Sequence, residues 1–212
     1  MPIKLILFDL DGTLVDTSKD ITTALNFALK QYGIKELSVQ ETIKMVGEGI
    51  TRLIEKILGD KKIHMRDEII RRFIEYYSEH LSDYSREYPY VRETLEQLSG
   101  YKKAVISNKR ESLSVELLEK LDLLKYFNLV AGSDTTSEKK PSPVPIFHIM
   151  EKLDTRPYES MIVGDSSFDI EAGKKAGIKT VAVTYGYRER HYLQGADYMI
   201  DSLKDLASLI YT

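Results

Sequence analysis

The 212-residue sequence predicts an α/β fold in which a parallel sheet is covered by helices on both faces. From residue 86 onward, short apolar runs alternate with amphipathic helical segments, the pattern of a parallel sheet with crossover helices. Between residues 16 and 85 the pattern is helical only. We therefore predict an α/β core domain made of residues 1–15 and 86–212, and a small all-helical domain, residues 16–85, inserted after the first strand.

The first strand is an apolar run over residues 5–8, suited to a strand that is buried on both faces. It leads into the sequence Asp9-Leu10-Asp11-Gly12-Thr13. In an extended chain, residues i and i+2 point to the same side, so Asp9 and Asp11 are expected to converge. They would do so at the carboxyl end of the strand, where open α/β sheets bind their ligands. An isolated Asp-Gly pair would indicate only a turn.

The inserted segment begins with apolar residues at helical spacing after Asp16. Ser38 and Glu41 fit a capping box, which predicts a short helix through Val46, and residues 47–49 end it. Two further helices are expected over residues 50–58 and 65–81. Three tyrosines are expected to pack in the core of this segment with their hydroxyls near its rim: Tyr76, Tyr77 and Tyr84.

The second half of the chain continues the sheet. Strands are predicted at residues 104–106, 127–131, 160–163, 180–183 and 198–200, and helices at 91–98, 113–121, 144–153, 170–176 and 203–210. Gly177 follows one of these helices at the position where a C-terminal glycine is common.

Polar stretches follow three of the later strands, as one follows the first. They are Ser107-Asn108-Lys109, the loop containing Glu138-Lys139-Lys140, and the segment from Gly164-Asp165 to Asp169. Each alone has an ordinary interpretation as a turn, a solvated charge run or a helix cap. Because the carboxyl ends of parallel strands share one edge, we expect these side chains to meet Asp9 and Asp11 there.

These residue types suit phosphoryl transfer, which depends mainly on positioning and on charge stabilisation. Asp9 can act as the nucleophile and form an aspartyl-phosphate. Asp11 can protonate the leaving oxygen and later deprotonate the hydrolytic water. Ser107 and Asn108 can donate hydrogen bonds to phosphate oxygens, and Lys140 offers a compact positive charge. Backbone N–H groups around residues 10–13 could add an anion-binding nest.

The concentration of negative charge predicts a metal ion. Two carboxylates ~4 Å apart repel each other by about 4 kcal/mol at an effective dielectric constant of 20. Asp9, Asp165 and a phosphate can gather around one point only with a cation between them. Oxygen ligands and a phosphate favour Mg²⁺.

Composition restricts the partners. The net charge of −3 gives no electrostatic basis for binding nucleic acid or an anionic membrane, and no apolar stretch reaches the roughly 20 residues of a membrane span. The absence of cysteine excludes disulfides and thiolate chemistry. We expect a cytoplasmic protein, monomer or homodimer, whose partner is a small phosphorylated metabolite.

The order of these stretches resembles the four motifs of the haloacid dehalogenase superfamily. Asp9-Leu10-Asp11-Gly12-Thr13 is similar to the first motif, Ser107 to the second, Lys140 to the third, and Gly164-Asp165 through Asp169 to the fourth. The resemblance implies a Rossmann-like core with the helical segment as a cap. It also implies that Mg²⁺ is bound by Asp9, the backbone carbonyl of Asp11, and Asp165, with Asp169 nearby or orienting Lys140.

Within the superfamily, the chain resembles phosphoglycolate phosphatases. The similar stretches are Met45-Val46-Gly47-Glu48-Gly49, Ser107-Asn108-Lys109, Lys140-Pro141-Ser142-Pro143-Val144-Pro145 and Thr184-Tyr185-Gly186-Tyr187. Ser107 stands where such proteins usually carry Thr, and Glu48 where they often carry Asn. Arg52 is expected on a helix surface, and Arg188 in a solvated loop.

Three alternative functions stay open at this point. The same scaffold could carry a phosphosugar mutase similar to β-phosphoglucomutase, or an inorganic pyrophosphatase. A phospho-acceptor module similar to receiver domains also places acids and a lysine at strand ends, although the helical insertion and the paired acids on the first strand fit it poorly.

Overall fold

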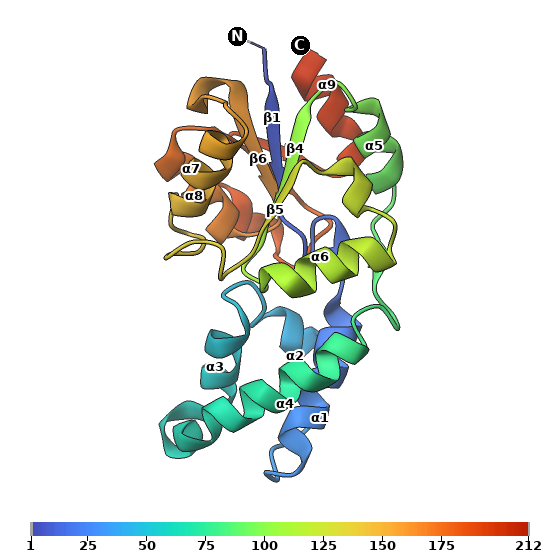
Figure 1. The fold of residues 1–212 in the computed structure, drawn as a ribbon. Coiled ribbons are helices and arrows are strands. Elements are labelled where there is room, and N and C mark those ends of the chain that lie inside the picture. The colour runs from blue at the N-terminus through green and yellow to red at the C-terminus, as the bar shows by residue number, and fades with distance from the viewer. Residues whose placement is uncertain (1, 212) are drawn as a thin grey trace.

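A computed structural model describes residues 2–211 (Figure 1). Its centre is a six-stranded sheet in the order β5-β4-β1-β6-β7-β8, with all neighbouring strands parallel. The strands are β1 (Leu5–Phe8), β4 (Lys102–Ile106), β5 (Leu129–Ala131), β6 (Ser160–Gly164), β7 (Lys179–Val183) and β8 (Tyr198–Ile200). The prediction of a parallel sheet is confirmed.

Helices cover both faces of this sheet. They are α5 (Val91–Gln97), α6 (Glu111–Lys120), α7 (Val144–Lys152), α8 (Ser167–Ala176) and α9 (Leu206–Tyr211), with 3₁₀ turns η2 (Leu124–Tyr126), η3 (Pro157–Glu159), η4 (Arg190–Leu193) and η5 (Leu203–Asp205). Successive residues of β1 face opposite ways. Leu5 and Leu7 pack in a cluster with residues of α7 and α8, whereas Ile6 and Phe8 pack in a cluster with residues of α5, α6 and α9.

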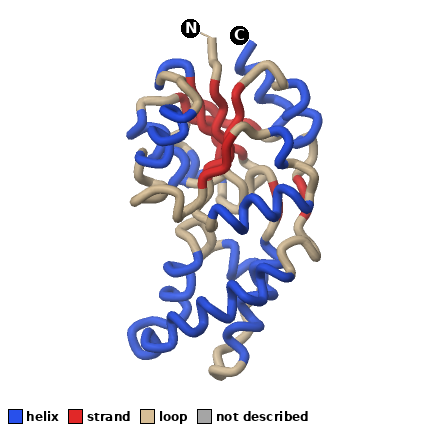
Figure 2. Tube along the Cα trace, in the orientation of Figure 1, coloured by secondary structure: helices blue, strands red, loops and turns tan. Residues whose placement is uncertain are grey.

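The segment between the first and later strands is helical, as predicted. It contains α1 (Ser18–Lys30), α2 (Val39–Ile43), α3 (Ile50–Lys62), the 3₁₀ turn η1 (Ile63–Met65) and α4 (Arg66–Glu79). Figures 1 and 2 show these helices gathered beyond the carboxyl ends of the strands, at the opposite end of the molecule from both termini. The predicted capping box at Ser38 is confirmed, but α2 ends at Ile43 and not at Val46.

Two short strands connect the helical segment to the core. β2 (Val15–Asp16) pairs antiparallel with β3 (Arg86–Glu87), so the chain enters and leaves the helical segment at neighbouring points. Asp16 pairs with Arg86 in this ribbon, and α1 begins at Ser18, so the helical pattern begins after Asp16 as predicted. The exact domain boundaries stay a prediction.

A buried carboxylate also links the two points at which the chain passes between the core and the helical segment. Asp20 of α1 accepts hydrogen bonds from the backbone N–H of Ser85 at 2.7 Å and from its hydroxyl at 2.7 Å. Tyr84 donates its backbone N–H to the same carboxylate. The side chain of Tyr84 is half-exposed beneath the ammonium of Lys19, so the prediction that it packs in the core was wrong.

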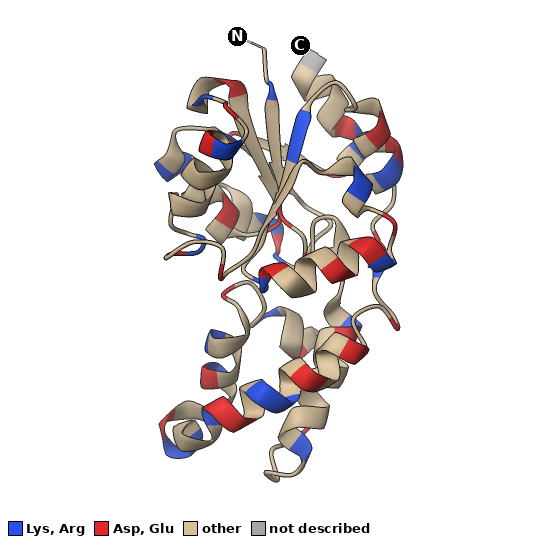
Figure 3. Ribbon diagram, in the orientation of Figure 1, with Lys and Arg blue, Asp and Glu red and all other residues tan. Residues whose placement is uncertain are grey.

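The described residues contain no helix that is long and apolar enough to cross a membrane. Acidic and basic residues are interspersed along the helices (Figure 3).

Gly173 sets how closely α8 approaches the sheet, and α8 carries part of the site described below. A Cβ atom at Gly173 would lie 2.5 Å from Thr180 Cγ2 and 2.6 Å from Ile162 Cγ2. Alanine improves helix propensity by about 1 kcal/mol, but overpacking costs about 1–3 kcal/mol.

We therefore expect Gly173→Ala to lower the free energy of unfolding by about 1 kcal/mol in urea denaturation. Gly100→Ala is the matched control, because a Cβ there would meet nothing within 4 Å. A more stable Gly173→Ala protein would show that helix propensity outweighs the clash.

Candidate active site

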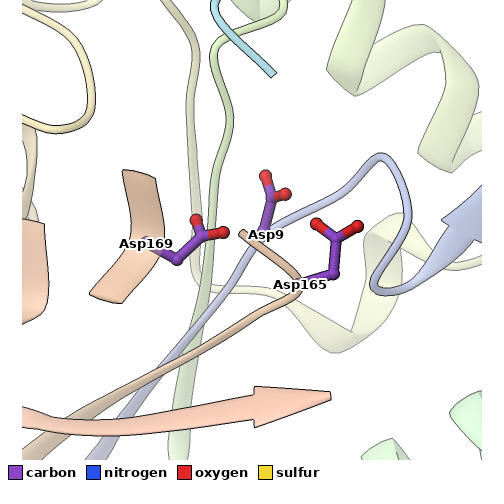
Figure 4. Close-up of side chains that lie close together, drawn as sticks. All are labelled: Asp9, Asp165 and Asp169. Carbon is purple, nitrogen blue, oxygen red and sulfur yellow. The ribbon is translucent and has the colours of Figure 1, made fainter. Parts of the chain in front are cut away.

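Three buried aspartates meet at the carboxyl edge of the sheet (Figure 4). Asp9 follows β1, Asp165 follows β6, and Asp169 lies in the first turn of α8. One carboxylate oxygen of each lies within 4.8 Å of the others. The predicted convergence of the first and fourth polar stretches is confirmed by this cluster.

Lys140 supplies the positive charge that faces this cluster. Its ammonium donates to Asp9 Oδ1 at 2.7 Å, to Asp169 Oδ1 at 2.6 Å and to the carbonyl of Ile106 at 2.8 Å. The side chain is only 3% exposed. Burial alone would lower the pKa of Lys140, but the carboxylates of Asp169 and Asp9 raise it above its usual value. Lys140 is therefore a fixed cation, held by three acceptors.

Asp169 is fixed from its other side as well. Its Oδ2 accepts hydrogen bonds from the backbone N–H of Ser166 at 3.1 Å and from the Ser166 hydroxyl at 2.6 Å, which caps α8. Both oxygens of Asp169 thus have partners within the protein. The residue is placed to orient Lys140, one of the two positions that the sequence left open for it.

Two glycines make room for the aspartates. A Cβ at Gly164 would lie 2.2 Å from Asp169 Cγ, so only glycine permits this approach. Gly12 has φ +88°, a conformation that favours glycine, and a Cβ there would lie 2.4 Å from Asp165 Oδ2. Asp165 Oδ2 accepts the backbone N–H of Tyr187 at 2.6 Å.

The cluster holds more negative charge than one lysine balances. Burial raises the pKa of Asp165 to about 7, and the charge of Asp169 adds to this increase. Burial also raises the pKa of Asp9 well above its usual value; Lys140 opposes this effect, and Asp169 and Asp165 reinforce it. Buried carboxylates of this kind are ligands that could hold a cation.

Ser107 lies at the end of β4 beside this cluster. Its Oγ accepts the backbone N–H of Lys109 at 3.1 Å, which leaves its own hydroxyl hydrogen without an acceptor among residues 2–211. Within the same described range, the backbone N–H groups of Leu10, Asp11 and Asn108 have no acceptor either. Several N–H and O–H donors are thus available at the strand ends, as an anion site requires.

The side chain of Asn108 makes two hydrogen bonds to backbone carbonyls. Its amide donates to the carbonyl of Gly47 at 2.8 Å and to that of Lys140 at 2.9 Å. Both amide hydrogens are used, so in this arrangement none is left for a phosphate. The side chain instead joins the helical segment to the loop that carries Lys140.

Asp11 lies apart from the cluster of three aspartates but lines the same cavity. Its Oδ1 accepts hydrogen bonds from Lys109 Nζ at 2.5 Å and from Thr17 Oγ1 at 2.6 Å. The sequence identified Lys109 only as part of a motif and gave it no role. Its position directly after Ser107-Asn108, at a strand end, was the available signal.

The cavity lies between the strand ends and the helical segment and has a volume of about 470 Å³. All of its acidic and basic lining residues belong to the core; Asp9, Lys109 and Lys140 are examples. The lining from the helical segment is mainly apolar and includes Ile21, Val46, Ile50, Leu53, Phe73 and Ile74. The cavity thus has one charged wall and one apolar wall.

The loop before α3 is held to the core through its backbone carbonyls. Besides Asn108, Lys139 donates to the carbonyl of Glu48 at 2.5 Å, and Arg188 donates to the carbonyl of Ile43 at 2.8 Å and to that of Val46. The prediction that Arg188 lies in a solvated loop was therefore wrong. Sequence periodicity does not reveal contacts that a side chain makes to distant backbone carbonyls.

Glu48 and Arg52 of the helical segment do not line the cavity. The Glu48 carboxylate pairs with Lys56, and Arg52 pairs with Glu55 at 2.8 Å. The acidic side chain of Glu48 thus faces its own helical segment and not an anionic ligand.

The fold is that of an α/β enzyme with a parallel sheet, and its cavity lies between the sheet edge and a helical insertion. A family model described as haloacid dehalogenase-like hydrolase matches residues 6–183, and the chain belongs to this family.

Two similar relatives share nearly the whole chain. A phosphoglycolate phosphatase of Aquifex aeolicus is 43% identical over 209 residues, covering 98% of this chain and 96% of the relative. One of Nitrosospira multiformis is 36% identical and covers 99% of this chain and 96% of the relative.

A solved structure described as a predicted phosphoglycolate phosphatase from Haemophilus somnus has a TM-score of 0.90 and 33% identity, and covers 98% of this chain and 97% of the other.

Because of the raised pKa values, the free energy of unfolding of the metal-free protein depends on pH. Between the ordinary carboxyl pKa of about 4 and the folded-state value of about 7 for Asp165, the folded protein binds more protons than the unfolded chain. Its stability therefore falls as the pH rises through this window.

We expect the free energy of unfolding, measured in EDTA, to decrease from pH 5 to pH 7 by up to about 1.4 kcal/mol per pH unit for each proton involved. Asp165→Asn should flatten this slope, because it removes one of the titrating groups. Equal slopes in both proteins would contradict the assignment.

Proposed function

We propose that this protein is a Mg²⁺-dependent phosphatase of small phosphate monoesters, with 2-phosphoglycolate as its foremost substrate. The observation that carries the proposal is the grouping of Asp9 and Asp165 beside the fixed cation Lys140, next to unpaired donors at the strand ends. The relatives named as phosphoglycolate phosphatases support the choice of substrate.

Asp9 is the proposed nucleophile. Lys140 holds its Oδ1, whereas Oδ2 has no hydrogen-bond partner among residues 2–211. Oδ2 attacks phosphorus, an Asp9–phosphate bond forms, and the ester P–O bond breaks. Water then attacks the same phosphorus, the bond to Asp9 breaks, and inorganic phosphate leaves with the Asp9 carboxylate restored.

Asp11 is the proposed proton carrier for both half-reactions. It gives a proton to the departing alcohol oxygen in the first and takes one from the attacking water in the second. Its carboxylate lines the cavity, and its Oδ2 has no partner among the described residues.

The phosphate oxygens are proposed to bind the hydroxyl of Ser107 and the backbone N–H groups of Leu10, Asp11 and Asn108. These donors lack acceptors within residues 2–211, and several lie at the ends of neighbouring strands. Lys140 adds a positive charge at the same place. For Asn108 we thus propose substrate binding through its backbone N–H, since its amide donates to the carbonyls of Gly47 and Lys140.

The carboxylates fit Mg²⁺ because they are hard oxygen donors with uncompensated charge. Asp9 and Asp165, together with the backbone carbonyl of Asp11, would hold the ion. When bound, it would neutralise charge on the phosphate oxygens and the carboxylates. Asp169 would stay with Lys140, since both of its oxygens already have partners.

The helical segment, residues 16–85, is proposed to act as a cap domain over the core, residues 1–15 and 86–212. Its apolar wall faces the charged wall across the cavity, so a closed cap would keep bulk water from the aspartyl-phosphate.

With Mg²⁺ present, we expect hydrolysis of 2-phosphoglycolate to exceed that of other phosphate monoesters in kcat/KM. EDTA should abolish turnover, and added Mg²⁺ should restore it, because the carboxylates otherwise repel the substrate. Phosphate release across a panel of monoesters measures this. Preferred turnover of pyrophosphate, or isomerisation of a hexose 1-phosphate with a bisphosphate primer, would instead favour the pyrophosphatase or the mutase.

Asp9→Asn should reduce kcat by at least about 10³-fold and abolish acid-stable labelling of the protein by ³²P substrate, because the amide cannot form the phosphoenzyme. Glu48→Gln is a matched control, since that carboxylate lies outside the cavity. Undiminished hydrolysis by Asp9→Asn would refute the nucleophile. A single stable phosphorylation of the wild-type protein without turnover would indicate a phospho-acceptor module.

A further inference from the structure

Lys109 and Asp11, in two loops of the core, form an ion pair. Lys109 Nζ contacts Asp11 Oδ1 at 2.5 Å, and the two side chains are only 7% and 12% exposed. Burial alone would lower the pKa of Lys109, but Asp11 and Tyr77 raise it above its usual value. The ammonium of Lys109 is thus directed at the carboxylate of Asp11.

The second partner of Lys109 comes from the helical segment. The ammonium donates to the hydroxyl oxygen of Tyr77, in α4, at 2.9 Å, and lies 5.2 Å from the centre of its ring. Tyr77 is 1% exposed and stacks on Phe73. The prediction that its ring packs in the core was right, but its hydroxyl points to the active site and not to the rim.

Both donors to Asp11 bind the same oxygen. Lys109 and Thr17 converge on Oδ1, which fixes the plane of the carboxylate and leaves Oδ2 for proton transfer. Thr17 in turn lies within hydrogen-bond distance of the Tyr187 hydroxyl. Asp11 is thus held from the core by Lys109 and from the start of the helical segment by Thr17.

We propose that Lys109 is a positioning residue that aims Asp11 at the substrate oxygen, and that Tyr77 holds Lys109 in place only while the cap rests on the core. This proposal rests on the acid–base role of Asp11 under the proposed function. It makes proton transfer depend on cap closure, since opening the cap removes the Tyr77 hydroxyl from Lys109.

Docking of the cap does not need this contact. Asn108, Lys139 and Arg188 already hold the loop before α3 through its backbone carbonyls. None of those three contacts touches Asp11. Among the described residues, Thr17 at the start of the cap contacts Asp11 directly, and the Lys109–Tyr77 pair connects α4 of the cap to the same carboxylate.

The first test uses Lys109→Met and Tyr77→Phe in the full chain, with Mg²⁺ and an alkyl phosphate that the wild-type protein hydrolyses. We expect kcat to fall by about 30-fold or more in Lys109→Met and by about 5- to 10-fold in Tyr77→Phe, with KM within about threefold. Tyr76→Phe is the matched control, because that ring stacks on Phe27 and His80 away from the cavity.

The second test asks whether both residues act through Asp11. In an Asp11→Asn background, Lys109→Met and Tyr77→Phe should change kcat by less than about threefold. Single-turnover release of p-nitrophenol should also be nearly unaffected in the single variants, since this leaving group departs without a proton. A merely structural role would slow all of these reactions alike.

The outcomes distinguish the positioning role of Lys109 and Tyr77 from the acid–base role of Asp11. Equal losses with and without Asp11, a raised KM at constant kcat, or a Tyr77→Phe protein that behaves as Tyr76→Phe would overturn the positioning role. Tyr77→Phe keeps the packed ring, so it remains informative where Lys109→Met fails to fold. Full activity of Asp11→Asn alone would refute the acid–base role in the proposed function.

Discussion

The structure depends on one buried charge interaction, the contact of Lys140 with Asp9 and Asp169. Desolvating three groups of this kind is costly unless each finds a partner of opposite sign in good geometry. Lys140 meets this condition because its ammonium also reaches the carbonyl of Ile106, at the end of the neighbouring strand. The loop that carries the lysine is thereby fixed to the strand ends of β1 and β4, and to α8.

This interaction makes the three carboxylates of the cluster differ in how their oxygens are held. Asp169 has partners on both oxygens, whereas Asp9 keeps one oxygen without a partner among the described residues. Asp165 is held by a single backbone N–H. The protein thus divides three similar side chains into one that orients the lysine and two whose oxygens face the cavity. The charge they leave unbalanced is what a divalent cation would offset.

The parallel sheet and the cluster at its edge could be predicted because short-range patterns encode both. Asp9, Ser107 and Asp165 each follow an apolar run, and parallel strands bring such positions to one edge whatever the details of the helices. The contacts of Tyr77, Asn108 and Arg188 could not be predicted. They join the helical segment to the core, and they depend on how the two pack together and not on any local period.

The short ribbon of β2 and β3 has an evolutionary consequence. The chain leaves the core and returns to it at paired residues, Val15 with Glu87 and Asp16 with Arg86. The strand order of the six-stranded sheet therefore does not depend on the length of the segment between them. A different insertion of any length could begin and end at the same two points without altering strand order or the aspartate cluster. The architecture therefore allows the apolar wall of the cavity to change by exchange of one contiguous stretch of sequence, while the strand order and the aspartate cluster are kept.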